Sequence, residues 1–412
     1  MNSNKSKRIV LSSNTAFSLY NFRLPLMKAL KEKGYDVVAV SPEDGKYSEL
    51  LKKEFSFFCG EKLRQKGNKS HLILFFWLGQ LLLVFAGVLL KHFKSNLIFF
   101  LNFISQFIYH LFFEYFLLFR RLKPDLVINF TIKPNIYGSI SAGLLGIPSI
   151  SVITGLGYTF IRESWLTKLV KLLYWLAFRF NRAVVFLNSE DLNTLKNISK
   201  EKSFLIESEG IDIKHFDSTL CKETKKDEFI FLFVGRLLTD KGIYELIKAF
   251  EKLKKEKPKV KLIIVGSPDE GNPNSISKGE LGKWVKEGLI EWYGFQEDVR
   301  PFYCMVDCVV LPSYYREGVP RVLLEAMAME KPIITTDAPG CRNVCVDGVN
   351  GFLVKPKDVE SLYSAMKRIV ELGDEKLREF GKAGRRLAEE KYSVEKIVGE
   401  YINLIEAVLS KS

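Results

Sequence analysis

Residues 229–242 read FIFLFVGRLLTDKG: a six-residue apolar run, a glycine, two cations and a second glycine. The apolar run predicts a buried strand at 229–234, and the spacing beyond it predicts a helix at 242–255. Backbone N–H groups and the helix dipole at such a turn favour an anion, which Arg236 and Lys241 would neutralise. Solvated loop cations are the alternative, but their pairing on one turn favours a phosphate site.

The same alternation of strands and helices extends in both directions from this stretch. Before it we expect strands at 9–12, 36–40, 125–130, 148–153 and 183–187, and helices at 22–33, 136–145 and 165–180. After it we expect strands at 260–265, 289–293, 307–311 and 332–335, and helices at 320–329, 358–371 and 394–410. Two such series predict an α/β protein with two doubly wound, Rossmann-like domains. Ligands of this architecture bind between the carboxyl ends of the strands.

The domain boundaries follow from this alternation and from a charged stretch. The first domain is predicted at 1–215 and the second at 229–392, with an exposed linker at 216–228. The final helical stretch, 393–412, is expected to pack back on the first domain.

Composition narrows the function classes. The net charge of +13 suits an anionic membrane or phosphorylated substrates, and no nucleic-acid-binding motif accompanies it. The basic start, Met1–Arg8, precedes an apolar run too short for a signal peptide, so a cytosolic site is expected. The six scattered cysteines predict reduced thiols, although Cys304/Cys308 and Cys341/Cys345 have a spacing that metal ligands also use.

A second stretch, residues 312–325, reads PSYYREGVPRVLLE. Pro320 stands where a helix would begin, so the helix N-terminus would point at the cleft with Gly318 and Val319. Glu317, just outside this helix, and Glu325, in its second turn, can accept hydrogen bonds from sugar and ribose hydroxyls. The alternative is that Glu317 complements the helix dipole and that Glu325 is a surface charge.

Together these residues resemble the donor site of retaining family 4 glycosyltransferases, which have the GT-B fold. Further matching stretches are 21–26 (NFRLPL), 131–138 (TIKPNIYG), 154–157 (TGLG), 210–212 (GID) and 336–342 (TDAPGCR). They resemble the bacterial branch that builds polysaccharides and lipid-linked oligosaccharides, including N-acetylhexosaminyltransferases.

This resemblance implies the role of each site residue. Glu317, Arg236 and Lys241 would be catalytic. The donor would be bound by Gly235, Arg236, Lys241, Gly318, Val319, Pro320 and Glu325, with the diphosphate on the two cations and the ribose on Glu325. The resemblance further implies a retaining, metal-independent hexosyltransferase without a cofactor, and the sequence contains no Asp-x-Asp triplet.

The implied substrates are a UDP-sugar, expected to carry an N-acetylhexosamine, and an undecaprenyl-diphosphate-linked saccharide. UDP is favoured over GDP by the resemblance alone. The enzyme would then work at the cytoplasmic face of the bacterial inner membrane, in contact with the membrane surface and without nucleic acid.

Two departures concern the first domain. The loop after its first strand, Ser12–Ala16, lacks the glycines that many relatives carry. Asn129-Phe130-Thr131 stands where many relatives carry a histidine. If a first-domain group steers the reaction or binds the acceptor, the candidates are Arg23, Lys133 and Asn135, whose alternative reading is loop structure and surface charge.

The least family-like part is an apolar hairpin predicted at 71–120. Residues 72–90 carry no charge and have the length of a membrane span, and 97–119 have a polar stripe at every fourth residue from Asn102 to Glu114. Cations at its tip, Lys91 to Lys94, oppose the positive-inside tendency of a full crossing. We therefore expect a hairpin held in the near leaflet, with a buried core helix as the alternative.

Two other function classes stay open on the sequence. A nucleotide-sugar epimerase or a phosphorylase of the same fold is one, although epimerases use histidines that this chain largely lacks. A catalytically inactive membrane scaffold is the other, and the intact charged residues of the donor site disfavour it.

Overall fold

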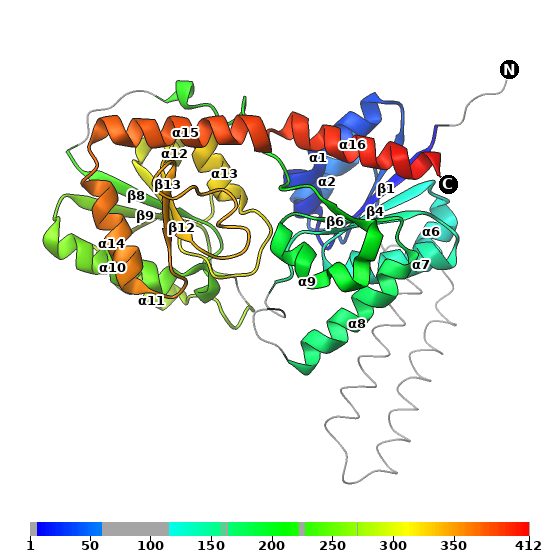
Figure 1. The fold of residues 1–412 in the computed structure, drawn as a ribbon, viewed down its shortest axis with the longest axis horizontal. Helices are drawn as coiled ribbons and strands as arrows, with labels where there is room; N and C mark the ends of the chain where they lie inside the picture. The colour runs from blue at the N-terminus through cyan, green and yellow to red at the C-terminus, as the bar shows by residue number, and fades with distance from the viewer. Residues whose placement is uncertain are drawn as a thin grey trace, which may run out of the picture.

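The computed structural model describes residues 6–59, 115–157, 160, 164–221, 227–269 and 271–411. It has two parallel-sheet α/β domains side by side (Figure 1). Residues 71–114 of the predicted hairpin, with its polar stripe, lie outside the described residues. Among the helices of the described part, none is both long enough and apolar enough to cross a membrane.

The first sheet is parallel throughout its described strands, which run in the order β3-β2-β1-β4-β5-β6-β7. Val10 pairs with Val38 on one side and with Val127 on the other, so β1 is an interior strand of the sheet. The strands are β1 (Arg8–Ser12), β2 (Asp36–Val40), β3 (Ser56–Phe58), β4 (Leu126–Phe130), β5 (Ser149–Ile153), β6 (Ala183–Phe186) and β7 (Ser203–Leu205).

Alternate residues of β1 face two different cores, as expected for a sheet covered on both faces. Ile9 and Leu11 belong to a cluster with α1 (Ala16–Glu32) and α16 (Val394–Ser410), whereas Val10 packs with α6 (Leu117–Leu122). The C-terminal helix α16 therefore shares the core of the first domain. The other helical segments here are α2 (Lys46–Glu54), η2 (Pro134–Gly138), α7 (Ser139–Leu144), α8 (Trp165–Phe180), α9 (Ser189–Ser199) and η4 (Lys200–Lys202).

The predicted start of the first helix is wrong by six residues. We predicted residue 22, but α1 begins at Ala16 because the Thr15 side chain caps it by accepting from the Ser18 N–H at 3.1 Å. Pro25 lies inside the helix without ending it.

The second sheet is also parallel, in the order β10-β9-β8-β11-β12-β13. Its strands are β8 (Phe229–Val234), β9 (Val260–Val265), β10 (Glu291–Trp292), β11 (Cys308–Leu311), β12 (Ile333–Thr336) and β13 (Gly351–Val354). Its helical segments are η6 (Thr239–Lys241), α10 (Ile243–Glu256), α11 (Lys278–Lys286), α12 (Arg300–Met305), α13 (Arg321–Ala328), α14 (Val359–Val370) and α15 (Asp374–Tyr392). The strand predicted at 289–293 is present only as the two residues of β10, which lies at the edge of this sheet.

The sequence analysis missed α15, although it is a long helix. Its buried stripe is narrow and includes two glycines, Gly381 and Gly384, beside Phe380, Ala388 and Tyr392. A β-carbon at Gly381 would lie 2.2 Å from the Glu330 carbonyl oxygen, so glycine permits the close approach. Because glycine adds nothing to an apolar periodicity, the pattern of this helix is hidden in the sequence.

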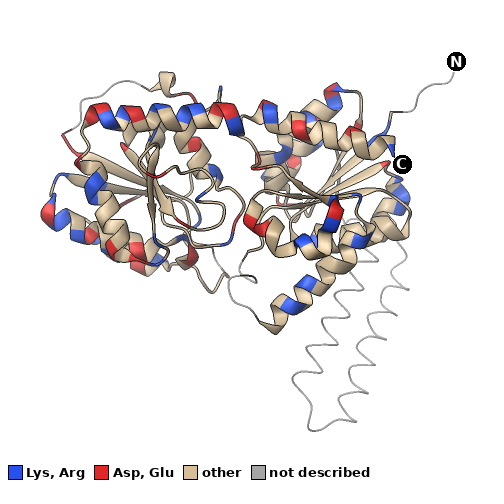
Figure 2. Ribbon diagram, in the orientation of Figure 1, with Lys and Arg blue, Asp and Glu red and all other residues tan. Residues whose placement is uncertain are grey.

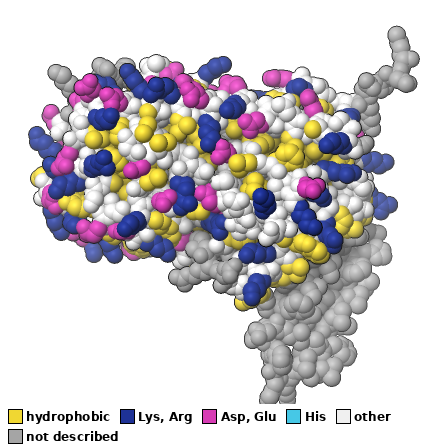
Figure 3. Space-filling model, viewed as in Figure 1, with side chains coloured by type: hydrophobic (Ala, Val, Ile, Leu, Met, Phe, Trp, Pro, Cys, Tyr) yellow, Lys and Arg dark blue, Asp and Glu magenta, His cyan; other side chains and the backbone are white. Residues whose placement is uncertain are grey.

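Charges of both signs are interspersed over the second domain in the view of Figures 2 and 3. Along α15, basic and acidic side chains alternate, and several are paired at helical spacing, as in Lys376–Glu379 and Arg385–Glu389. The net charge of +13 is therefore not concentrated on this helix.

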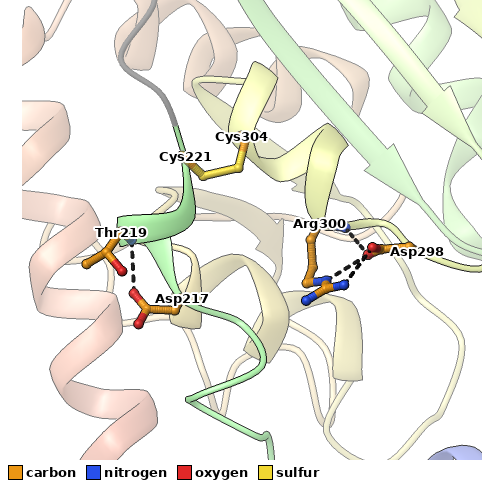
Figure 4. The surroundings of a disulfide bond; sticks show 6 residues. All are labelled: Asp217, Thr219, Cys221, Asp298, Arg300 and Cys304. Carbon is orange, nitrogen blue, oxygen red and sulfur yellow. Dashed lines mark hydrogen bonds and ion pairs between the residues drawn. A yellow bond between two sulfur atoms is a disulfide. The ribbon is translucent and has the colours of Figure 1, made fainter.

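One disulfide corrects the prediction of reduced thiols. Cys221, directly after η5 (Ser218–Leu220), is bonded to Cys304 in α12, with Cα atoms 5.1 Å apart (Figure 4). The bond ties the chain before β8 to the second domain, and a separation of 83 residues gives no sequence sign of the contact. Cys304 is thus not available as a metal ligand, while Cys59, Cys308, Cys341 and Cys345 are buried free thiols.

Candidate donor site between the two domains

Two loops from different domains meet where the sequence predicts the donor site. One follows β5 at residues 154–157, and the other follows β11 at residues 313–320. The Gly318 N–H donates to the Thr154 carbonyl at 3.0 Å, and the Gly157 N–H donates to the Arg316 carbonyl at 2.8 Å. The segment around Glu317 is therefore attached to the first domain by its backbone.

Glycine is required at this junction because backbones approach too closely for a β-carbon. At Gly155, where φ is +133°, a β-carbon would lie 2.8 Å from the Glu317 Cα. At Gly318 it would lie 2.8 Å from the Thr154 oxygen, and at Gly340, where φ is +82°, 1.7 Å from the Gly318 oxygen. Three of the stretches that the sequence analysis quoted thus meet at one point.

Lys241 and Glu317 form an ion pair at this junction. The Lys241 ammonium donates to both carboxylate oxygens, at 2.7 and 2.6 Å, and the Ser313 hydroxyl donates to one of them at 2.9 Å. The two side chains are only 12% and 18% exposed, so solvent screens the pair less than it screens a surface pair. An ammonium has three N–H donors, and these two bonds leave one for a phosphate oxygen.

The position of Lys241 is set by the packing of two loops of the second domain. Gly242, which ends η6, has φ +76°, and a β-carbon there would lie 2.2 Å from the Pro312 oxygen. The N–H groups of Tyr314 and Tyr315 both donate to the Asp240 carbonyl, at 3.0 and 3.1 Å. The turns after β8 and β11 therefore hold each other, which brings the two predicted motifs together.

Arg236 lies on the same turn but is not joined to Glu317. Its side chain is 58% exposed, and its guanidinium pairs with Asp269, on the loop after β9, at 3.0 Å. An exposed pair of this kind contributes little stability and leaves the guanidinium free to exchange its partner for a phosphate. Gly235, before it, has φ +152°.

Glu325, in the second turn of α13, is largely shielded from solvent, with 12% of its side chain exposed, so it is not a solvated surface charge. It accepts from the Tyr303 hydroxyl at 2.9 Å and from Arg321 Nε at 3.1 Å. Burial raises the pKa of Glu325, and Arg321 opposes this shift. Arg321 also donates to the Asn21 carbonyl in α1, so this cluster reaches the first domain. Ribose binding by Glu325 stays a prediction.

Helix α13 begins at Arg321, with Pro320 as the residue that caps it. The expectation of Pro320 inside the helix was thus wrong by one position. Gly318, Val319 and Pro320 are buried beneath the loop junction, so their contact with a sugar would be through backbone groups.

The three first-domain candidates differ in accessibility. Arg23 is 2% exposed, pairs with Glu209 and stacks on the Phe130 ring at 4.4 Å. Asn135 is 1% exposed, and its amide bonds both the N–H and the carbonyl of Val152. Lys133 alone of the three is exposed.

Asn129, at the position where the family resemblance led us to expect a histidine, is fully buried in the first domain. Its amide nitrogen donates to the Ser139 hydroxyl at 3.1 Å, and a β-carbon at Gly138 would lie 2.5 Å from its amide oxygen. Ser139, Ser151 and Asn181 continue this buried hydrogen-bond network. The side chain at this position therefore supports η2 and α7.

Sequence reasoning missed a second contact between the domains, centred on Arg316. Its guanidinium bonds Asp191 at 3.0 Å and the Thr194 hydroxyl at 2.6 Å, both on α9. Asp191 is fully buried. The side-chain oxygen of Asn188 caps α9 by accepting a hydrogen bond from the backbone N–H of Asp191 at 2.7 Å. Asn188 also donates to the Glu317 carbonyl at 3.3 Å. The sequence signal that could have located this contact is the helix start at Asn188, where a capping side chain is followed by acidic residues in the first turn.

Replacing Arg316 with alanine is expected to destabilise the protein more at pH 8 than at pH 5. Removing one partner of a buried pair costs about 3–5 kcal/mol. Burial raises the pKa of Asp191 and Arg316 lowers it, so this pKa rises further in R316A. The folded variant then binds a proton more tightly than the unfolded chain does, and its stability falls as pH rises from the unfolded pKa through the folded one.

The measurement is the melting temperature of R316A at the two pH values, beside the double variant R316A/D191N. The double variant leaves no buried charge and should recover part of the loss at pH 8. Equal losses at both pH values, or no recovery in the double variant, would contradict this role for the pair.

Comparisons with known proteins find glycosyltransferases among the proteins similar to this chain. Residues 221–387 match the family described as glycosyl transferases group 1. The chain is 28% identical over 388 residues to the N,N'-diacetylbacillosaminyl-diphospho-undecaprenol alpha-1,3-N-acetylgalactosaminyltransferase of Campylobacter jejuni, covering 90% of this chain and 91% of that one. It is 29% identical over 316 residues to the capsular polysaccharide biosynthesis glycosyltransferase CapM of Staphylococcus aureus, covering 72% and 80%.

Residues 221–387 form a group 1 glycosyltransferase domain. Among solved structures, a glycosyltransferase from Rickettsia africae is similar to this chain, with a TM-score of 0.72 and 17% sequence identity. The similarity covers 99% of this chain and 100% of that one. Anabaena Alr3699/HepE in complex with UDP-glucose has a TM-score of 0.71 and 18% identity over 97% and 99%. At such identities the likeness shows the GT-B-like fold, which confirms the predicted two-domain architecture but not the hairpin predicted in the first domain.

Proposed function

We propose that this glycosyltransferase moves an N-acetylhexosamine from a UDP-sugar to an undecaprenyl-diphosphate-linked saccharide during bacterial glycan or polysaccharide biosynthesis. The observation that carries the proposal is the Lys241–Glu317 pair at the junction of the two domains. The relatives support the choice of substrates, because the similarity to the Campylobacter jejuni enzyme spans nine tenths of both chains.

The proposed chemistry breaks the bond between the anomeric carbon and the diphosphate, and the electron pair leaves with the diphosphate. A new bond forms from the anomeric carbon to an acceptor hydroxyl oxygen, whose proton passes to an oxygen of the leaving diphosphate. Arg236 and Lys241 would stabilise the charge on the leaving diphosphate, which preorganised cations do best in a site partly shielded from water. Glu317, held by Lys241 and Ser313, would bind the transferred sugar with the backbone at Gly318–Pro320.

The test incubates the purified protein with radiolabelled UDP-N-acetylgalactosamine, UDP-N-acetylglucosamine or UDP-glucose and an undecaprenyl-diphosphate-linked saccharide. Label in the lipid fraction from one donor supports the proposal. Conversion of the donor sugar without acceptor would favour an epimerase, and no reaction with any donor would favour a scaffold. The anomeric configuration of the product, read by nuclear magnetic resonance, tests the proposed retention.

Transfer is expected to survive chelation, because the proposed leaving-group stabilisation uses protein cations and no divalent ion. We expect the initial rate in excess EDTA to stay within about twofold of the untreated rate. Loss of the rate in EDTA, with recovery on addition of Mg²⁺ or Mn²⁺, would show that the mechanism depends on a metal.

The place of action belongs to the same proposal. A polyprenyl-linked acceptor is confined to a bilayer, so the enzyme would associate with the cytoplasmic face of the inner membrane. Fractionation of the wild type against a variant lacking residues 72–94 tests whether the predicted hairpin contributes. If the wild type stays in the supernatant without detergent and in high salt, this association fails.

A further inference from the structure

The solvent side of α8 carries large apolar side chains. Trp165, Leu172 and Trp175 are 63%, 56% and 39% exposed, and Lys168 and Arg179 are exposed on the same side of the helix. Their spacings of three, four and seven residues place all five on one face. Figure 3 shows yellow and dark blue side chains together at the edge of the first domain where α8 runs.

None of these three apolar side chains belongs to the described core that α8 covers. The opposite face of α8 buries Val170, Tyr174, Ala177 and Phe178 in a core that also includes Phe186 from β6. A helix of a globular domain usually turns polar residues to solvent once one face is buried. Two tryptophans and a leucine on the outer face therefore indicate a second contact surface.

The charge of this surface has one sign. Helix α8 contains Lys168, Lys171 and Arg179 and no acidic residue, so Figure 2 shows it in blue and tan only. The Arg179 guanidinium stacks on the Trp175 ring at 4.5 Å, which places a cation next to the apolar face. An apolar face bordered by cations is the composition that binds at the interface of an anionic bilayer.

A basic cavity lies at the C-terminal end of the same helix. Its volume is about 580 Å³, and the cations that line it are Arg179, Arg182, Lys202 and Lys411. None of the described residues that line it is acidic. The Lys202 ammonium donates to the carbonyls of Phe178 and Arg179 at 3.1 and 3.0 Å. It therefore caps two of the last carbonyls of α8 and adds positive charge at this end of the helix. Burial and Arg182 lower the pKa of Lys202, as expected where cations face one another without a carboxylate.

We propose that the outer face of α8 and this basic cavity form a surface that docks on an anionic lipid bilayer, with the tryptophans at the interface and headgroup phosphates at the cavity. Tryptophan favours this interface because its ring is apolar and its N–H is polar. The inference deepens the proposed function, since it names where the first domain meets the membrane, but its test requires no glycosyl transfer.

The first experiment asks whether α8 itself meets lipid. The full chain with Leu172→Cys is labelled with an environment-sensitive fluorophore, beside Val285→Cys, an exposed apolar position on α11 of the second domain. We expect a blue shift at position 172, and none at 285, on adding vesicles of phosphatidylethanolamine with about one third phosphatidylglycerol. Absence of the shift at 172 would overturn the proposal, and so would a shift without lipid that grows with protein concentration, which would indicate a second copy as the occupant.

The second experiment tests the two parts of the surface by vesicle flotation. We expect W165S/W175S to weaken binding to these vesicles about tenfold or more, and the matched control L220S/V285S to leave it unchanged. R182E/K411E should also weaken binding about tenfold, because each cation near an anionic surface contributes on the order of 1 kcal/mol. Equal binding of the wild type and both variants would overturn the proposal.

Activity in detergent micelles separates this inference from the proposed function. If α8 variants lose vesicle binding but transfer sugar normally in micelles, both stand. If the wild type binds vesicles through α8 but transfers no sugar, the docking surface stands and the proposed function fails.

Discussion

Replacing Lys241 with alanine is expected to lower kcat/KM for the donor by about a hundredfold or more. A hydrogen bond to a charged group contributes about 1.5–3 kcal/mol, and Lys241 is proposed to supply one to the diphosphate while it holds both oxygens of Glu317. Arg236→Ala should have a smaller effect, about tenfold, because the side chain is exposed and already shares its charge with Asp269. Steady-state kinetics with the UDP-sugar, together with calorimetric binding of UDP, measure both effects.

Lys248→Ala provides the matched control, since Lys248 is exposed on the adjacent helix α10 and the site does not use it. It should leave kcat/KM and UDP affinity within about twofold of wild type, as expected for a surface substitution. Wild-type kinetics in K241A would remove the donor-site assignment. If K241A and K248A lowered kcat/KM equally, the effect would come from the loss of one positive charge anywhere near the site and not from the contact of Lys241 with the diphosphate.

Replacing Gly155 with alanine is expected to lower kcat by about a hundredfold while the protein stays folded. The added β-carbon would lie 2.8 Å from the Glu317 Cα and from the Gly318 nitrogen, so the two loops must separate. Displacement of a reacting geometry by about 1 Å costs on the order of a hundredfold in rate. The measurement is kcat at saturating donor, with the melting temperature as the check on folding.

Gly146→Ala controls for backbone strain without the clash. Gly146 has φ +71°, but no atom of the described residues lies within 4 Å of the position of its β-carbon. Each variant should lose about 1–2 kcal/mol of stability from the left-handed conformation, and only G155A should lose the rate. If the two variants have similar kcat values, close contact between these loops is not needed for catalysis.

The order of strands and helices was predictable because each series repeats a local rule. Parallel strands buried on both faces are apolar runs, as in residues 229–234, and the helices between them have an apolar stripe. Element ends were less predictable, since the side chain of Thr15 moved the start of α1 by six residues. Helix α15 was missed because glycines form part of its buried stripe.

For the candidate site too, local features were predictable from the sequence and long-range contacts were not. The sequence by itself determined that Arg236, Lys241 and Glu317 stand at strand ends and helix starts and that Glu325 lies in a second helical turn, because turn glycines and Pro320 are local signals. It could not show that Lys241 contacts Glu317, because the two residues are 76 positions apart.

Only the tertiary structure decided which polar groups are accessible. It buried Arg23 and Asn135 against protein partners, joined Cys221 to Cys304, and paired Arg316 with Asp191 across the domains. The physical reason is that burial and long-range pairing depend on which surfaces meet after the sheets form, whereas the sequence pattern reports only which face of each element is apolar.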